Sequence, residues 1–139
     1  MRSVMNIVKK AVAASLVAFL WSGAPAVAQT ADTRLADAAM KRDIAAVKAL
    51  VAQRVDVNAP GKDGTPALHW MVRVDDVETA RLLIGAGANV TLANRYGVTP
   101  LFLACANGNA RMIRLLVDAG ADVNAPDQAG ETPLMVGRG

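Results

Sequence analysis

The segment Gly120-Ala121-Asp122-Val123-Asn124 decides the fold, because the chain repeats it at a fixed distance. Similar segments stand earlier in the chain, Gly87-Ala88-Asn89-Val90-Thr91 and Arg54-Val55-Asp56-Val57-Asn58. The three segments begin at positions 54, 87 and 120, so the period is 33 residues. The same period separates Thr99-Pro100-Leu101 from Thr132-Pro133-Leu134. A constant period of this length is typical of a repeat array, in which each unit packs on its neighbours. The function of such a chain is expected on an extended surface and not in a catalytic cleft.

Each repeat unit is predicted to contain a helix, a tight turn, a second helix and a loop. In the third unit Thr99 is a good N-cap, and Pro100 follows at the first helical position, where its missing N–H costs nothing. The first helix should run to about Asn107, and the second should begin near Ala110. Gly120 should supply the left-handed residue that ends the second helix. The buried side of this second helix is predicted to be Met112, Ile113, Leu115, Leu116 and Val117.

The two earlier units follow this plan with two departures. Their helices are predicted over residues 32–40, 44–53, 67–74 and 77–84. Pro66 occupies a cap position, where its side chain cannot accept a hydrogen bond, so the helix after it should begin weakly or be shifted. Asp43 and either Asp75 or Asp76 should cap the second helices. Arg54 replaces the glycine expected after the second helix of the first unit, which predicts a strained or altered end.

These residues resemble the ankyrin repeat. Gly97-Val98-Thr99-Pro100-Leu101 is similar to the start of that family's unit, Leu115-Leu116-Val117 to its second helix, and Gly120–Asn124 to its end. The resemblance implies an all-α solenoid of helix-turn-helix units with projecting hairpin loops. It covers residues 29–139, as repeats at about 31–60, 61–93 and 94–126 and a partial repeat or C-terminal stub at 127–139. It also implies protein binding on the concave side and no common catalytic activity.

Residues 1–28 have the composition of a cleavable secretory signal peptide. A basic start is followed by an apolar run over residues 11–21, and Ala26-Val27-Ala28 supplies small residues at a cleavage site. We expect cleavage after Ala28 and a periplasmic or secreted mature protein of bacterial type. The alternative is an uncleaved anchor, but the apolar run is shorter than the roughly 20 residues that span a bilayer.

Charge and cysteine content exclude some classes of function. The whole chain has 15 basic and 12 acidic residues. Arg2, Lys9 and Lys10 lie in the leader and no acidic residue does, which leaves 12 of each sign in the mature chain. Nucleic-acid binding, which needs a persistent basic face, is therefore disfavoured. Cys105 is the only cysteine, so an intramolecular disulfide is excluded.

The resemblance to the ankyrin repeat also implies a protein-binding surface. The family's contact positions fall on loop residues and on the ends of the first helices: Lys41, Lys62, Asp63, Thr65, Arg73, Arg95, Tyr96, Val98, Asn107, Gln128 and Glu131. Arg95 and Tyr96 are the expected anchor pair, because Arg and Tyr are enriched among residues that dominate binding. The alternative is that Tyr96 packs on the neighbouring loop.

No catalytic, cofactor or metal site is predicted. His69 is the only histidine, and the resemblance implies that it links neighbouring loops by hydrogen bonds. Trp70 is interpreted as a core residue and Cys105 as a buried, inert thiol, since no basic group is placed to lower its pKa.

The sequence favours a non-catalytic adaptor or scaffold that binds another protein, of unknown identity, in the periplasm. The resemblance to exported bacterial ankyrin proteins suggests protection against peroxide as one setting. Two alternatives remain: a truncated, marginally stable remnant of a longer array, and a thiol-based redox protein that uses Cys105. Self-association through the incomplete last unit is a further expectation. Membrane binding is not expected after cleavage of the leader.

Overall fold

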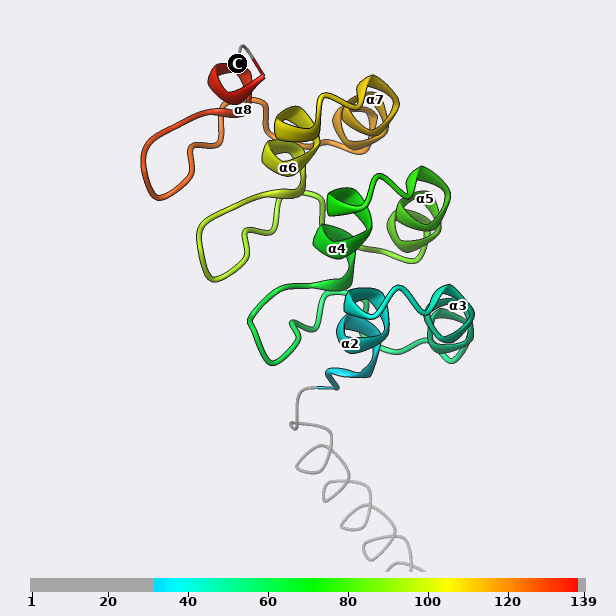
Figure 1. The fold of residues 1–139 in the computed structure, drawn as a ribbon. Coiled ribbons are helices and arrows are strands. Elements are labelled where there is room, and N and C mark those ends of the chain that lie inside the picture. Colours follow the sequence, from blue (N-terminus) through cyan, green and yellow to red (C-terminus); the bar gives the residue numbers. More distant parts are fainter. Residues whose placement is uncertain (1–31, 138–139) are drawn as a thin grey trace, which may run out of the picture. The chain divides into compact units, whose positions relative to one another are not determined.

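The computed structural model describes residues 32–137, and the predicted leader lies outside them (Figure 1). Within this range the secondary structure is helical. The only extended pairing among these residues is a single antiparallel bridge between Pro60 and Pro66. The helices are α2 (Arg34–Met40), α3 (Ile44–Ala52), α4 (Ala67–Arg73), α5 (Val77–Gly85), α6 (Pro100–Asn107), α7 (Ala110–Asp118) and α8 (Pro133–Val136).

The helices of residues 32–137 form two stacked columns. The inner column is α2, α4, α6 and α8, in which each helix packs on the next. The outer helices α3, α5 and α7 each pack on the inner helix of their own unit, and a loop extends from each unit on the other side of the inner column (Figure 1). This arrangement confirms the predicted all-α repeat solenoid.

The outer helices begin with equivalent caps. The side chains of Asp43, Asp76 and Asn109 each accept a hydrogen bond from the backbone N–H three residues later, at 3.0–3.1 Å. These positions are separated by one period each, and the choice between Asp75 and Asp76 is settled in favour of Asp76. Each such bond satisfies an amide that the first helical turn leaves without a partner.

The inner helices are capped less evenly. The Thr99 hydroxyl accepts from the backbone N–H of Phe102 at 3.3 Å, as predicted. Pro66 holds the same extended backbone before α4 and makes no side-chain cap. The predicted lack of a side-chain cap at Pro66 is therefore confirmed, whereas the helix start is not shifted, since α4 begins in register with α6.

Left-handed backbone marks the end of each outer helix. Gly87 and Gly120 have φ of 101° and 99°, and Arg54 stands at the equivalent position with φ of 58°. A side chain in this region is strained because Cβ approaches the following carbonyl oxygen. The predicted strain at Arg54 is therefore confirmed.

The buried residues line the contact between successive units, although the outer helices bury fewer than predicted. In α7 Met112 and Leu116 are fully buried, and Ile113 and Leu115 are partly buried. Val117 is 42% exposed, so its assignment to the buried side is wrong. It lies on the face of α7 that no later outer helix covers within residues 32–137.

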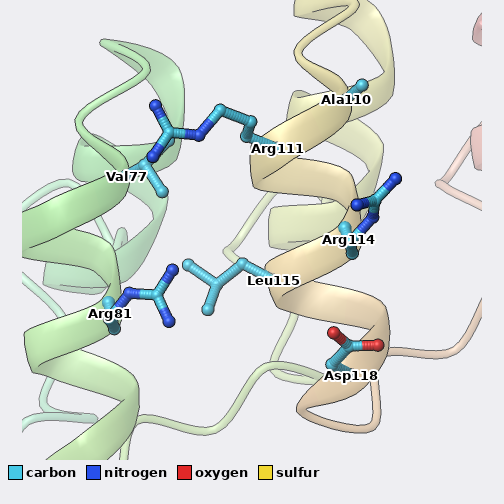
Figure 2. A pocket seen from close by; sticks show the side chains of 7 residues that line it. All are labelled: Val77, Arg81, Ala110, Arg111, Arg114, Leu115 and Asp118. Carbon is cyan, nitrogen blue, oxygen red and sulfur yellow. The ribbon is translucent and has the colours of Figure 1, made fainter.

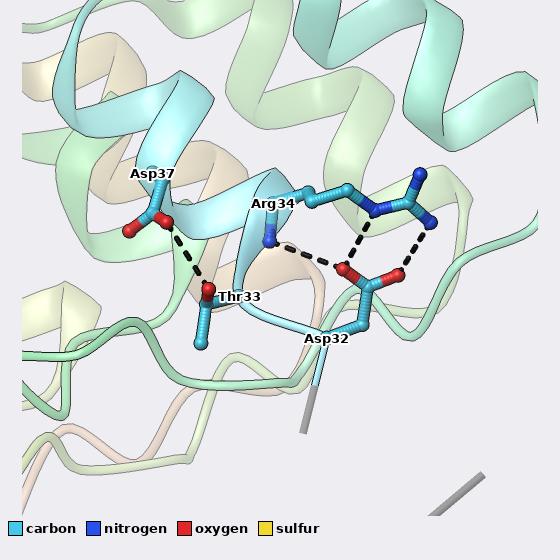
Figure 3. A network of polar contacts seen from close by, with 4 residues as sticks. All are labelled: Asp32, Thr33, Arg34 and Asp37. Carbon is cyan, nitrogen blue, oxygen red and sulfur yellow. Dashed lines mark hydrogen bonds and ion pairs between the residues drawn. The ribbon is translucent and has the colours of Figure 1, made fainter. Parts of the chain in front are cut away.

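An exposed polar network stands at the start of α2, shown in Figure 3. Both carboxylate oxygens of Asp32 accept from the Arg34 guanidinium, at 2.9 and 2.7 Å, and Asp32 Oδ1 also accepts from the Arg34 backbone N–H. These bonds lower the pKa of Asp32 to about 2. The Thr33 hydroxyl donates to Asp37 at 3.1 Å. The helix begins at Arg34, two residues later than predicted.

Candidate functional site

The projecting loops share one hydrogen-bond pattern, which fixes their shape. The backbone N–H of Gly61, Asn94 and Asp127 donates to the carbonyl oxygen four residues later, at 2.9–3.1 Å. Asn94 Oδ1 and Asp127 Oδ1 also accept from two backbone N–H groups inside their own loops. Each loop is therefore a preorganised turn that holds its outer side chains in fixed places.

Neighbouring loops are stacked through two long side chains. A Cβ on Gly64 would lie 2.8 Å from Arg95 Nε, and a Cβ on Gly97 would lie 2.6 Å from Gln128 Cγ. Arg95 and Gln128 thus lie over the glycine of the preceding loop, and Gln128 Nε2 donates to the Arg95 carbonyl at 3.1 Å. These side chains help to hold the loops at their spacing.

His69 connects the second unit to the third. Its Nε2 lies 2.9 Å from the Val98 carbonyl oxygen, so this nitrogen carries the proton and donates. The predicted role of His69 as a link between loops is confirmed. Burial lowers its pKa, while the carbonyls of Val98 and Leu92 act in the opposite direction. His69 Nδ1 is buried and has no hydrogen-bond partner among the described residues.

A pocket of about 210 Å³ lies at the angle between the loops and the inner helices. Its lining residues come from two successive loops and from α4 and α6: Asp63, Thr65, His69, Trp70, Arg73, Asn94, Tyr96 and Leu103. We refer to it as the concave pocket. Asp63 and Tyr96 are one period apart, as are Trp70 and Leu103, so matching positions of two units build it.

The concave pocket brings together four of the predicted binding residues: Asp63, Thr65, Arg73 and Tyr96. Tyr96 is 58% exposed, so much of its ring can meet a partner. Thr65 is only 7% exposed, which corrects the expectation that it projects. The remaining predicted residues lie outside the pocket: Lys41, Lys62, Arg95, Val98, Asn107, Gln128 and Glu131.

Val98 and Asn107 make structural contacts too, in addition to those of Arg95 and Gln128. The Val98 carbonyl accepts from His69, and the side chain is only partly exposed. The Asn107 amide nitrogen lies 3.0 Å from the Val72 carbonyl oxygen and 3.2 Å from Asp75 Oδ1. It therefore satisfies the C-terminal end of α4 from the next unit.

Trp70 lines the pocket, although the sequence was interpreted to place it in the core and not among the binding residues. It is partly buried, and the Arg73 guanidinium lies 5.6 Å from the centre of its ring. This is within the range of a cation–π interaction. Trp70 thus has one side in the core and another on the pocket, which its register with Leu103 could have indicated.

The described residues give little support for a redox site, a metal site or a membrane-spanning helix. Cys105 is partly buried, less than predicted, and desolvation raises the pKa of its thiol, which disfavours the thiolate. No group of three metal-ligating side chains occurs between residues 32 and 137. None of the helices in that range combines the length and apolarity needed to cross a bilayer.

Comparisons with known proteins agree with this architecture. The family model described as "Ankyrin repeats (3 copies)" matches residues 68–137. Neurogenic locus notch homolog protein 1 is 41% identical over 58 residues in Xenopus tropicalis and 44% identical over 55 residues in Homo sapiens. These matches cover 42% and 40% of this chain and 2% of each relative. Notch-regulated ankyrin repeat-containing protein A of Danio rerio is 39% identical over 54 residues, which is 39% of this chain and 48% of that protein.

Proposed function

The chain belongs to the ankyrin-repeat family, whose members are protein–protein interaction modules and generally not catalysts. From this premise we propose that its concave pocket binds a segment of another protein. The observation that carries the proposal is the combination of lining residues. Trp70 and Tyr96 offer aromatic surface, Arg73 offers a cation and Asp63 an anion, all around one cavity of about 210 Å³. Such a cavity takes one side chain of a partner and fixes the orientation of its backbone by polar contacts.

Rigidity favours binding at this pocket. The loops that carry Asp63 and Tyr96 are closed by backbone hydrogen bonds, and His69 ties the α4 side of the pocket to Val98. Because these groups are already ordered before a partner binds, little of the binding free energy is lost in ordering them. Tyr96 is exposed and lines the pocket. Truncation of such an aromatic anchor typically costs about 2 kcal/mol, or roughly 30-fold in Kd.

A cross-linking capture experiment with paired variants tests this function. The 139-residue chain would be compared with Arg73→Ala/Tyr96→Ala and with Lys48→Ala, an exposed control on the outer helix α3. Circular dichroism would establish that each is folded. We expect the same partner with the parent chain and with Lys48→Ala, and its loss with the double variant. Equal capture by all three proteins, each folded, would overturn the concave pocket as the binding site.

We also propose that the chain is exported, with cleavage after Ala28, and acts as a non-catalytic adaptor in the periplasm. The basic start, the apolar run and Ala26-Val27-Ala28 support this proposal, and they lie outside the described residues. Mass spectrometry of the protein from a periplasmic fraction should give a chain that begins at Gln29. A chain that retains Met1 in the cytoplasm would contradict export. Protection against peroxide is the setting we propose, and a survival assay of a deletion strain tests it.

Self-association is a second candidate, which exposed apolar residues in the last unit favour. Leu134 is 66% exposed, whereas Leu68 and Leu101, the equivalent residues in earlier units, are 2% exposed. Met135 beside it is exposed as well. Analytical ultracentrifugation should detect a dimer that Leu134→Lys abolishes. A monomer at all concentrations would reject this candidate.

A further inference from the structure

A second cavity lies on the opposite side of the inner column, between the outer helices α5 and α7. Its volume is about 300 Å³, and we call it the outer slot. Val77 and Leu115 supply its apolar floor, and Leu115 extends from α7 toward α5 in Figure 2. Both residues also contact the buried core, so the floor is held in place by packing. The outer slot is independent of the concave pocket, with which it shares no lining residue.

Cations dominate the rim of the outer slot. Arg81 stands on α5, and Arg111 and Arg114 stand on α7. In Figure 2 the side chains of Arg81 and Arg111 lie in the space between the two helices near Leu115, whereas the Arg114 guanidinium extends away from α5. Asp118 is the one acidic lining residue and lies at the end of α7. Arg81 and Arg114 take part in no ion pair among residues 32–137. Their charges are therefore available to a ligand.

The third arginine is held only weakly. Arg111 lies 3.8 Å from Glu78, and both side chains are more than three-quarters exposed. An ion pair this long and this exposed to water contributes little, because solvent screens it. A ligand carboxylate can therefore pair with Arg111 as well. Glu78 and Asp118 are the acidic side chains that repel such a ligand and compete with it for the arginines.

Apolar surface continues from the outer slot to the next pair of outer helices. A neighbouring hollow between α3 and α5 shares Arg81 with the outer slot. Its other lining residues are Val51, Leu82, Gly85 and Ala86 and one acidic residue, Glu78. Leu82 is exposed there. A partner that crosses the outer helices thus meets apolar surface on both sides of Arg81.

We propose that the outer slot is a second protein-binding site, which takes an acidic, amphipathic segment of a partner protein. An apolar side chain of that segment packs on Leu115 and Val77, while its Asp or Glu side chains pair with Arg81 and Arg111, which lie between the two helices. Guanidinium groups bind carboxylates with two parallel N–H···O bonds, which gives this pairing its geometry. The neighbouring apolar hollow favours a protein segment over a small inorganic anion, which would leave that surface uncovered.

Titration of the ¹⁵N-labelled 139-residue chain with a designed peptide tests the proposal. The probe is a helical peptide with Glu on one face and Leu on the other, and a second peptide carries Lys in place of Glu. We expect the Glu peptide to shift amide signals in residues 77–81 and 111–118 and the Lys peptide to shift none. Arg81→Gln/Arg111→Gln should weaken Glu-peptide binding about tenfold, as expected for the loss of charged partners.

Matched variants and a small anion make the result decisive. Lys48→Gln and Arg95→Gln each remove one exposed cation elsewhere and should leave the Kd unchanged, as should Tyr96→Ala in the concave pocket. Equal weakening by Lys48→Gln or Arg95→Gln would show general charge attraction and overturn the proposal. Binding of inorganic phosphate at the same amides as tightly as the Glu peptide would also overturn it, since the ligand would then be an anion alone. Loss of peptide binding with Tyr96→Ala would assign the peptide to the concave pocket instead.

Discussion

Replacing Pro66 by threonine should stabilise the protein, although it introduces a polar side chain at a buried position. Thr99 stands one period later with nearly the same backbone, φ −90° and ψ 160° against −68° and 161° at Pro66. The Thr99 hydroxyl accepts from the N–H of Phe102, and His69 occupies the position of Phe102 in the second unit. The hydroxyl that Pro66→Thr introduces should therefore accept from the His69 backbone N–H.

The magnitude follows from three contributions. A new N-cap stabilises by about 1 kcal/mol. The hydroxyl proton is then available to His69 Nδ1, which lacks a partner, and a hydrogen bond to a buried polar atom contributes about 1 kcal/mol more. Loss of proline raises the conformational entropy of the unfolded chain, which lowers the stability by about 0.4–1 kcal/mol. The net gain is about 1 kcal/mol, or roughly 4 °C in Tm for a domain of this size.

Denaturant unfolding of three proteins checks this reasoning. Pro66→Ala is the matched control, because it loses the proline ring but gains no hydroxyl, so it should be less stable than the parent. The Pro66→Thr protein should unfold at a higher denaturant concentration than both. Equal midpoints for the Thr and Ala variants would refute both expected hydrogen bonds, since the hydroxyl would then make neither.

Three further predictions rest on the left-handed backbone at Gly64 and Arg54 and on the burial of His69. Gly64→Ala should destabilise by at least about 1 kcal/mol in chemical unfolding, because φ is 79° and the new Cβ would meet Arg95 Nε at 2.8 Å; an unchanged midpoint would mean that the loops are not stacked as described. Arg54→Gly should raise stability by up to about 1 kcal/mol, since φ of 58° is strained for arginine and not for glycine; a decrease would show that the Arg54 side chain makes a stabilising contact. Burial lowers the folded-state pKa of His69 below 6.5, so its neutral form is favoured by folding, and stability should be full above about pH 6.5 and fall as the pH drops below it. Unfolding midpoints measured from pH 7.5 to 5 should show this fall, and His69→Gln should lose it.

The constant repeat period made most of the fold predictable. It located the helices, and it identified Pro66 and Arg54 as departures from the pattern, which the structure confirms. Exposure was less predictable, because it depends on whether a neighbouring unit covers a given face. Val117 has the apolar character of a buried residue, yet no later outer helix covers it within the described range.

The candidate site was predictable in part, for a similar reason. Tyr96 and Arg73 were identified from their positions in the repeat, and both line the concave pocket. Arg95, the other half of the expected anchor pair, is exposed and also lies against Gly64, because the glycine leaves room for a long side chain from the next loop. Contacts of this kind join different units, so local pattern within one unit does not reveal them.

The regular links between units have a consequence for the growth of such genes. His69 bonds to Val98, Asn107 to Val72 and Gln128 to Arg95, so each of these links joins one unit to the next. An in-frame duplication of residues 94–126 would repeat the Asn107 link at each new joint, because Asn107 donates to a backbone carbonyl of the preceding unit. It would not repeat the His69 link, because Phe102 stands at the equivalent position and has no hydrogen-bond donor in its side chain. Every added copy would bring Phe102 to the position that His69 holds in the second unit, so new pockets would arise with a different chemistry from the first.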